Sequence, residues 1–228
     1  LGPDHRTIVP DLVGHGSSTS PESPTAHSVD AMVDHVIALA DALALPTFHL
    51  VGYSMGGRVA LTLACAHPAR VTTLSLIGAS AGLADPAERA QRRAADEALA
   101  TDIEGSGLEA FVDRWMANPL FATQSRLGGD FLASARAQRL ANDPAGLVRS
   151  LRGAGTGAMT ALHDRLAHCA VPTLLVAGAD DPKFAAIAED LAAVIPNATV
   201  AVIEDAGHAA HLEQPDAVAA VIRAHLDA

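Results

Sequence analysis

The sequence predicts an α/β protein with a mostly parallel sheet, helices on both faces of that sheet, and an inserted helical cap. Short apolar runs alternate with helical patterns, which is typical of parallel strands joined by helices. Residues 83–166 show helical patterns and no strand candidate. A chain of 228 residues with 50% hydrophobic composition can bury one large core. We therefore expect a core made of residues 1–82 and 167–228, and a cap made of residues 83–166.

The first part of the chain predicts a strand, a loop and a helix. Residues 6–9 favour a short strand, and the turn residues that fill positions 10–27 favour a loop. His15 lies in that loop, where we expect it to hydrogen-bond the local backbone. Apolar residues recur at helical spacing over residues 29–43, and Ser28 is placed to cap this helix.

The later elements follow from the same two periodicities. Apolar runs predict strands, and helical spacing predicts helices. The strands are expected over residues 48–51, 71–77, 173–177 and 199–203, and the helices over residues 58–66, 184–194 and 216–226. In such sheets, ligands bind beyond the carboxyl ends of the strands. The loops that follow these strands are therefore where we look for functional residues.

A glycine-rich turn joins the strand at 48–51 to the helix at 58–66. Residues 52–58 read Gly-Tyr-Ser-Met-Gly-Gly-Arg. A Gly-x-Ser-x-Gly turn between a strand and a helix is typical of a nucleophile elbow, which holds the serine exposed on a strained turn. Ser54 is therefore the candidate reactive residue, and the N–H of Met55 at the helix N-terminus is a candidate oxyanion donor. The alternative is a glycine-rich turn with an incidental serine.

Two late loops hold partners for this serine. A serine hydroxyl needs a histidine to take its proton and an acid to orient that histidine. His208 lies after the strand at 199–203 and directly after a glycine, so it is the candidate for this histidine. His211, three residues later, is the alternative. Asp180 and Asp181 follow the strand at 173–177. We favour Asp181, which stands third after the glycine that follows the strand, and expect Asp180 to be a turn residue that bonds local backbone.

Charge and composition exclude several classes of partner. A net charge of -11 argues against nucleic acid or an anionic membrane, because both require a basic face. The sequence shows no membrane-spanning run, no signal peptide, and neither a metal cluster nor a phosphate loop, so no cofactor and no metal are expected. Cys65 and Cys169 have no disulfide or metal spacing, fit a reducing compartment such as the cytoplasm, and are expected to be packing residues.

The elbow, the late acid and the late histidine together resemble the α/β-hydrolase superfamily over essentially the whole chain. Finer features resemble the 2-succinyl-6-hydroxy-2,4-cyclohexadiene-1-carboxylate synthases of menaquinone biosynthesis. The shared features are the elbow sequence at 52–58, Glu-Arg-Ala-Gln-Arg-Arg at 88–93, Trp115 with Pro-Leu-Phe-Ala at 119–122, Arg139 before Asn142, Asp-Pro-Lys-Phe at 181–184, and Gly207-His208 with His-Leu-Glu-Gln-Pro at 211–215.

The resemblance implies a lyase that eliminates pyruvate from a cyclohexene with three carboxylates. Ser54, deprotonated by His208 with Asp181 behind it, would then be a base and not an acylated nucleophile. An acidic protein needs local arginines for such a substrate, because guanidinium forks match carboxylates.

The resemblance also assigns the residues that would contact this substrate. It selects Arg58, Arg92 and Arg139 for the carboxylates. Each arginine has a plain alternative as a solvated or structural residue, and Arg92 has acidic neighbours on its helix with which it could pair. Trp115 and Tyr53 are expected either to line the pocket or merely to pack.

One departure from the superfamily concerns its second oxyanion donor. The superfamily supplies that N–H from a His-Gly loop after an earlier strand, and no such loop precedes Asp11 here. That strand normally lies between the strand at 6–9 and the elbow strand, so we expect a gap in the sheet centre and interpret the chain as a fragment. Two other functions stay open, namely an ester hydrolase with the same triad and a catalytically silent ligand-binding protein. The sequence does not indicate an oligomeric state.

Overall fold

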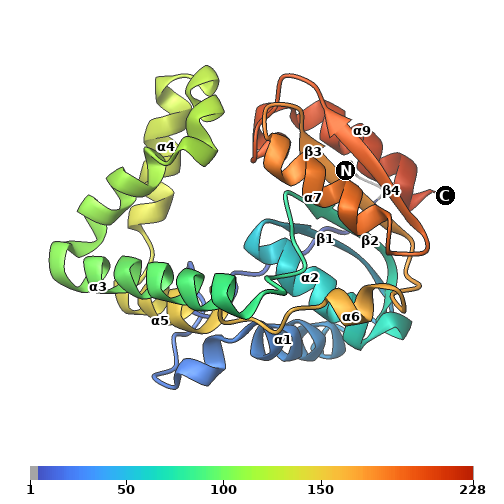
Figure 1. Ribbon diagram of the computed structural model, residues 1–228, viewed down its shortest axis with the longest axis horizontal. Helices are drawn as coiled ribbons and strands as arrows, with labels where there is room; N and C mark the ends of the chain where they lie inside the picture. The colour runs from blue at the N-terminus through green and yellow to red at the C-terminus, as the bar shows by residue number, and fades with distance from the viewer. Residues whose placement is uncertain (1–4, 228) are drawn as a thin grey trace.

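A computed structural model, which describes residues 5–227, shows a four-stranded parallel sheet with helices packed on it and further helices to one side (Figure 1). The strands lie in the order β1-β2-β3-β4, which is also their order in the sequence. Their bounds are Phe48–Tyr53 for β1, Val71–Ile77 for β2, Thr173–Gly178 for β3 and Ala198–Ile203 for β4. The parallel sheet and these four predicted strands are confirmed.

The helices also follow the sequence closely. They are α1 (Val29–Ala42), α2 (Met55–Ala66), α3 (Pro86–Met116), α4 (Gly129–Leu140), α5 (Pro144–Ala154), α6 (His163–Leu166), α7 (Pro182–Ala192), α8 (Ala210–Glu213) and α9 (Pro215–Leu226), with 3-10 turns η1 (Pro24–His27), η2 (Pro68–Arg70) and η3 (Pro119–Leu127). Ser28 caps α1 as expected, because its side chain accepts a hydrogen bond from the N–H of Ala31. The elbow helix α2 begins three residues earlier than predicted, directly after Ser54.

The two faces of the sheet pack against different helices. Side chains at alternate positions of a strand point to opposite faces. Leu74 and Leu76 of β2 therefore pack with α1, α2 and α7, together with both free cysteines, Cys65 and Cys169. Ile77 of β2 packs on the other side with α9. The core thus fixes the sheet between two helical layers, and the carboxyl ends of β1, β3 and β4 come to one edge.

The strand expected over residues 6–9 does not form, and that prediction is wrong. These residues are exposed, with 86% of the Val9 surface accessible, and they pair with no strand of the sheet. A strand needs a neighbour for its backbone groups. Within residues 5–227, strand β1 pairs only with β2 and forms an edge of the sheet, where Val51 is 43% exposed. Among these residues, no strand lies between β1 and residues 6–9, which is where the sequence analysis expected one to be missing.

Between residues 83 and 166 the structure contains helices and no strand, as the sequence predicts. Helix α3 changes direction at Gly107, which has φ 82° and ψ 165°. A separate apolar cluster, with Ile103, Phe111 and Val148 among its members, joins α3 to α5. Figure 1 shows α3, α4 and α5 grouped to one side of the sheet. The division of the chain into core and cap at residues 83 and 166 stays a prediction.

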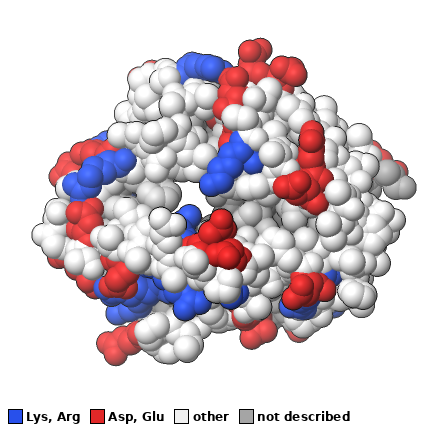
Figure 2. All heavy atoms as spheres, viewed as in Figure 1, with Lys and Arg blue, Asp and Glu red and all other residues white. Residues whose placement is uncertain are grey.

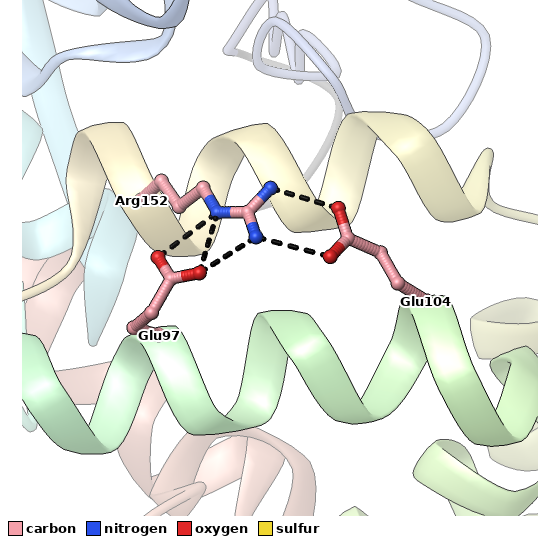
Figure 3. Close-up of polar contacts among 3 residues, drawn as sticks. All are labelled: Glu97, Glu104 and Arg152. Carbon is pink, nitrogen blue, oxygen red and sulfur yellow. Dashed lines mark hydrogen bonds and ion pairs between the residues drawn. The ribbon is translucent and has the colours of Figure 1, made fainter.

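An ion-pair cluster fastens two of these helices to each other. The guanidinium of Arg152 on α5 lies between the carboxylates of Glu97 and Glu104 on α3, with N···O distances of 2.7–3.2 Å (Figure 3). Both carboxylates have a lowered pKa, chiefly because they accept hydrogen bonds from Arg152. In the part of the chain that the structure describes, no helix is both long enough and apolar enough to cross a membrane.

Candidate active site

The elbow between β1 and α2 places Ser54 in a strained conformation at the end of the strand. Its φ is 49° and its ψ is −108°, in the left-handed half of the map that a non-glycine residue rarely occupies. The N–H of Ser54 donates to the carbonyl of Ile77 at 2.8 Å, and its own carbonyl accepts from Arg58 at 3.1 Å. Backbone bonds to β2 and α2 therefore hold the serine in place.

The glycines beside Ser54 allow β1 and α2 to approach. A Cβ placed on Gly52 would lie 2.5 Å from the carbonyl oxygen of Gly56. A Cβ on Gly57 would lie 2.5 Å from the Cβ of Ala79. Gly56 has open space on its side-chain face. Gly52 and Gly57, one before the serine and one in the helix, are therefore the two that the packing requires.

A hydrogen-bonded chain links this serine to the late histidine and the late acid. Nε2 of His208 lies 3.1 Å from Oγ of Ser54, and Nδ1 of His208 lies 2.9 Å from Oδ2 of Asp181. A carboxylate only accepts, so Nδ1 carries the proton and Nε2 is free to accept from the serine hydroxyl. His208 is 2% exposed and Asp181 is 7% exposed. The geometry is that of a base aimed at Ser54.

The acid is held by the start of helix α7. Asp181 is the N-cap residue of α7, and its Oδ1 accepts from the N–H of Phe184 at 3.2 Å. One carboxylate oxygen thus serves the helix and the other serves His208. The ring of Phe184 also packs on His208, with 4.4 Å between centroids. This arrangement fixes both the acid and the plane of the imidazole.

The loop that carries His208 is fixed by a residue that the sequence analysis did not single out for function. Oε2 of Glu213, on α8, accepts from the N–H of Gly207 at 2.9 Å. Its other oxygen, Oε1, is buried without a partner among the described residues. Only the spacing of a carboxylate six residues after a loop glycine could have indicated this bond. Glu213 therefore ties α8 to the histidine loop.

Three other polar residues of these loops have roles that the structure resolves. The prediction that the Asp180 side chain bonds local backbone is wrong. Its Oδ2 accepts a hydrogen bond from Nη1 of Arg126 at 2.6 Å. Arg126 reaches this oxygen because η3 of the cap region lies beside the loop. His211 packs on Tyr53, with ring centroids 4.4 Å apart, and burial lowers its pKa to about 4. Nδ1 of His15 bonds the carbonyl of Val13 at 3.1 Å, as expected.

The three candidate arginines fall into two groups. Arg58 is buried and donates to the carbonyl of Ala154 at 2.7 Å. Burial, and then the nearby charge of Arg92, lower the pKa of Arg58 to about 10. Nε of Arg92 donates to Oδ1 of Asp96 at 2.8 Å, one of the acidic pairings that its helix offered. Arg58 and Arg92 thus form one basic group beside a carboxylate.

Arg139 lies apart from that group, on α4. It lines a cavity of about 370 Å³ with residues of α4, Asn142 and Leu212 of α8. Its Nη1 donates to the carbonyl of Ala135 at 2.9 Å. Its charge also acts on Tyr53, where it opposes the effect of burial, which raises the pKa of the phenol. Arg139 therefore lies on the side of the site that Tyr53 occupies.

An aromatic chain runs from the cap region to the histidine. The ring of Trp115 stacks on Phe111 at 5.7 Å and meets Phe121 at 5.8 Å, and Phe121 lies 6.1 Å from His208. Trp115 is half-buried, so it both packs and connects the cap to the site. Met55 opens α2, and its sulfur accepts from Oγ of Ser150 on α5 at 3.8 Å.

The space between cap and core is open in the structure. Figure 2 shows a hollow between the two, with basic and acidic side chains at its margin. Among residues 5–227, no group of three or more His, Cys, Asp or Glu side chains is placed to hold a metal ion. The arrangement offers a base at Ser54, helix N–H groups beside it, and arginines for an anion.

Comparisons with known proteins give a consistent result. The family model described as "alpha/beta hydrolase fold" matches residues 1–215. A provisionally named 2-succinyl-6-hydroxy-2,4-cyclohexadiene-1-carboxylate synthase of Bacillus subtilis (strain 168) is 39% identical over 213 residues, covering 93% of this chain and 78% of that protein. The synthase of the same name from Serratia proteamaculans (strain 568) is 32% identical over 222 residues, covering 97% and 83%. The structure of MenH from S. aureus superposes with a TM-score of 0.91 at 36% identity, covering 95% and 81%.

Proposed function

Because this chain belongs to the α/β-hydrolase fold family and, within it, to the 2-succinyl-6-hydroxy-2,4-cyclohexadiene-1-carboxylate synthases, we propose that it is a lyase of menaquinone biosynthesis. It eliminates pyruvate from 2-succinyl-5-enolpyruvyl-6-hydroxy-3-cyclohexene-1-carboxylate. The single observation that carries the mechanism is the chain of hydrogen bonds from Ser54 through His208 to Asp181, at 3.1 and 2.9 Å. We expect it to act in the cytoplasm and without a cofactor.

The reaction forms one ring double bond, moves another and breaks one C–O bond. The ring proton beside the succinyl ketone is removed, and its electron pair forms the 2,3 double bond. The 3,4 double bond moves to the 4,5 position, and the bond from C5 to the enolpyruvyl oxygen breaks. The proton taken by the base passes to the departing group, which leaves as pyruvate. The protein must therefore supply a base, and donors for the enolate that forms on the ketone oxygen.

Ser54 is the proposed base, with His208 as the group that receives its proton. Removal of the hydroxyl proton is favoured because the buried imidazolium that results lies 2.9 Å from Asp181. The N–H of Met55, at the N-terminus of α2, is the proposed donor to the enolate oxygen. In this role Ser54 takes up and returns a proton and forms no bond to a substrate carbon, so no covalent intermediate is expected.

The substrate carries three carboxylates, and a protein with a net charge of -11 must offset their charge locally. Arg58, Arg92 and Arg139 are the proposed partners. A hydrogen bond between charged groups contributes about 1.5 to 3 kcal/mol. Tyr53 and Trp115 would line the same space, because the Tyr53 ring lies 5.4 Å from His208 and Trp115 connects to that histidine through Phe121.

The test is pyruvate release from this cyclohexene carboxylate by the full chain. We expect turnover in the wild type, and none above background in Ser54→Ala and His208→Ala. His15→Ala is the matched control, because that histidine bonds the carbonyl of Val13 in its own loop and has no hydrogen bond to Ser54, His208 or Asp181, so its loss should leave the rate within about threefold. A folded wild-type protein that releases no pyruvate would contradict the proposal.

An ester hydrolase is the second candidate, because the same hydrogen-bonded serine and histidine serve acyl transfer. Trapping of Ser54 by an organophosphonate, together with a burst of product from a neutral ester, would favour that function. Ligand binding that survives Ser54→Ala, with turnover of neither substrate, would indicate a silent binding protein.

A further inference from the structure

Asp96 is a buried carboxylate that no step of the proposed mechanism uses. It lies on α3, about three turns after the start of that helix, and is 2% exposed. Carboxylates are rarely buried to this extent unless they are paired. Its Oδ1 accepts from Nε of Arg92 at 2.8 Å, and its Oδ2 is buried without a partner among the described residues. A buried charge that uses half of its acceptor capacity calls for an explanation.

The contact with Arg92 uses one edge of the guanidinium. A guanidinium carries five N–H donors in a planar fork, and a carboxylate binds it best along an edge that presents two parallel N–H groups. Asp96 accepts the hydrogen bond from the Nε–H of Arg92. Within residues 5–227 no other hydrogen bond of this guanidinium is present, so its outer two nitrogens remain available. The Arg92 side chain is 43% exposed, while that of Asp96 is 3% exposed.

The same carboxylate lies beside the second arginine of the group. Arg58 donates to the carbonyl of Ala154, the last residue of α5. Oδ2 of Asp96 lies against the next residue, because a Cβ placed on Gly155 would be only 2.3 Å from it. The Arg58 guanidinium and the Asp96 carboxylate are therefore both near the end of α5. Arg58 and Arg92 repel each other, and this repulsion lowers the pKa of Arg58 while Asp96 opposes it. Two like charges in a partly buried site need a counter-charge when no anion is bound.

We propose that Asp96 is a positioning residue of the substrate site, which fixes Arg92 by its Nε edge and offsets the charge of Arg92 and Arg58, so that the outer edge of Arg92 is presented to a substrate carboxylate. This inference rests on the proposed function. The simpler alternative is an i,i+4 ion pair that only stabilises α3, and such pairs contribute little to a helix.

The positioning role and the purely stabilising ion pair predict different kinetics of pyruvate release. Asp96→Ala frees Arg92 to rotate, so KM rises about tenfold while kcat falls less than about threefold. Asp96→Asn keeps an oxygen that can accept from Nε, so its KM stays within about threefold of the wild type. In Arg92→Ala, a second change of Asp96→Ala adds no further increase in KM, because the group to be positioned is gone.

Glu97 provides the matched control, because it is the neighbouring carboxylate on α3 but pairs with Arg152 on the cap exterior (Figure 3). Glu97→Ala removes the same charge and is expected to leave KM unchanged. If Asp96→Ala does not fold, Asp96→Ser carries the same test, because its hydroxyl is too short to reach Nε. Unfolding in urea is measured for every variant.

Three outcomes would overturn the inference. The first is an unchanged KM in a folded Asp96→Ala variant. The second is a KM for Asp96→Asn that rises as much as the KM for Asp96→Ala. The third is a KM increase in the double variant that equals the combined increases of Asp96→Ala and Arg92→Ala. Failure of the proposed function is separate, since then the wild type releases no pyruvate. If the wild type turns over but Arg92→Ala leaves KM unchanged, Arg92 does not bind substrate and the role of Asp96 falls with it.

Discussion

Substitution of Gly52 tests the close approach of β1 and α2 that supports Ser54. In Gly52→Ala, the added Cβ would lie 2.5 Å from the carbonyl oxygen of Gly56 and 2.7 Å from Cα of Gly57. Ordinary contacts between carbon atoms are about 3.5 to 4.0 Å, and both neighbours are backbone atoms, so α2 must move by about 1 Å. Overpacking of this kind costs about 1 to 3 kcal/mol.

The same movement affects the site. Ser54 stands between the two elements, and its Oγ is 3.1 Å from Nε2 of His208, close to the upper limit for a hydrogen bond. A displacement of about 1 Å breaks this bond, and a misplacement of that size can lower the rate about 100-fold. We therefore expect Gly52→Ala to lower the melting temperature by about 2 to 10 °C and the rate of pyruvate release by about two orders of magnitude.

Gly56 is the matched control in the same motif. It has no atom within 4 Å of the Cβ that alanine would add, and it lies in the first turn of α2. Gly56→Ala is therefore expected to keep the fold, with a gain of up to about 1 kcal/mol from the lower helix propensity of glycine. Urea denaturation of both variants gives the free energies of unfolding. Equal stability of Gly52→Ala and the wild type would refute the packing argument.

Three further predictions concern the loops and the cap. Glu213→Ala leaves the N–H of Gly207 without its acceptor and lowers the free energy of unfolding by about 1 to 3 kcal/mol, whereas Glu213→Gln keeps an acceptor and most of the stability, which urea denaturation measures. Because burial lowers the pKa of His211 to about 4, the unfolded chain binds a proton at His211 that the folded chain refuses, so stability falls as the pH drops from about 6.5 to about 4. Thermal unfolding across that range should show a shallower slope in His211→Gln, and an unchanged slope would contradict the assignment. Arg152→Ala removes the contacts drawn in Figure 3 and should cost about 1 kcal/mol at low salt and less at high salt, and a loss independent of salt would argue against an electrostatic origin.

Some long-range partners were beyond what the sequence could indicate. The sequence favoured Asp181 over the adjacent Asp180 as the partner of His208, and Asp181 is the one that bonds it, but nothing in the sequence indicated that Asp180 bonds Arg126 of η3. That bond depends on which way the Asp180 side chain leaves the turn, and on η3 lying beside it. The partners of Asp96 and Glu213 are of the same kind, because a carboxylate in a helix has many possible donors until the neighbouring segments are placed.

The wrong prediction at residues 6–9 has a related cause. A local pattern can favour an extended backbone, but a strand forms only where another strand is near enough to bond it. In the described residues the sheet ends at β1, and Val51 on that strand is 43% exposed. Local preference and tertiary pairing are separate conditions, and at residues 6–9 only the first was met.

The sequence alone determined the order of strands and helices, the elbow at Ser54, and the two late loops that carry the acid and the histidine. These follow from periodicity and turn residues, which act over a few neighbouring positions. Only the tertiary structure decided that Gly52 is constrained while Gly56 is free, that Asp180 bonds Arg126, and that Asp96 bonds Arg92 in the neighbourhood of Arg58. The physical reason is that contacts between distant segments depend on distances of a few ångströms, which are set when the layers pack together.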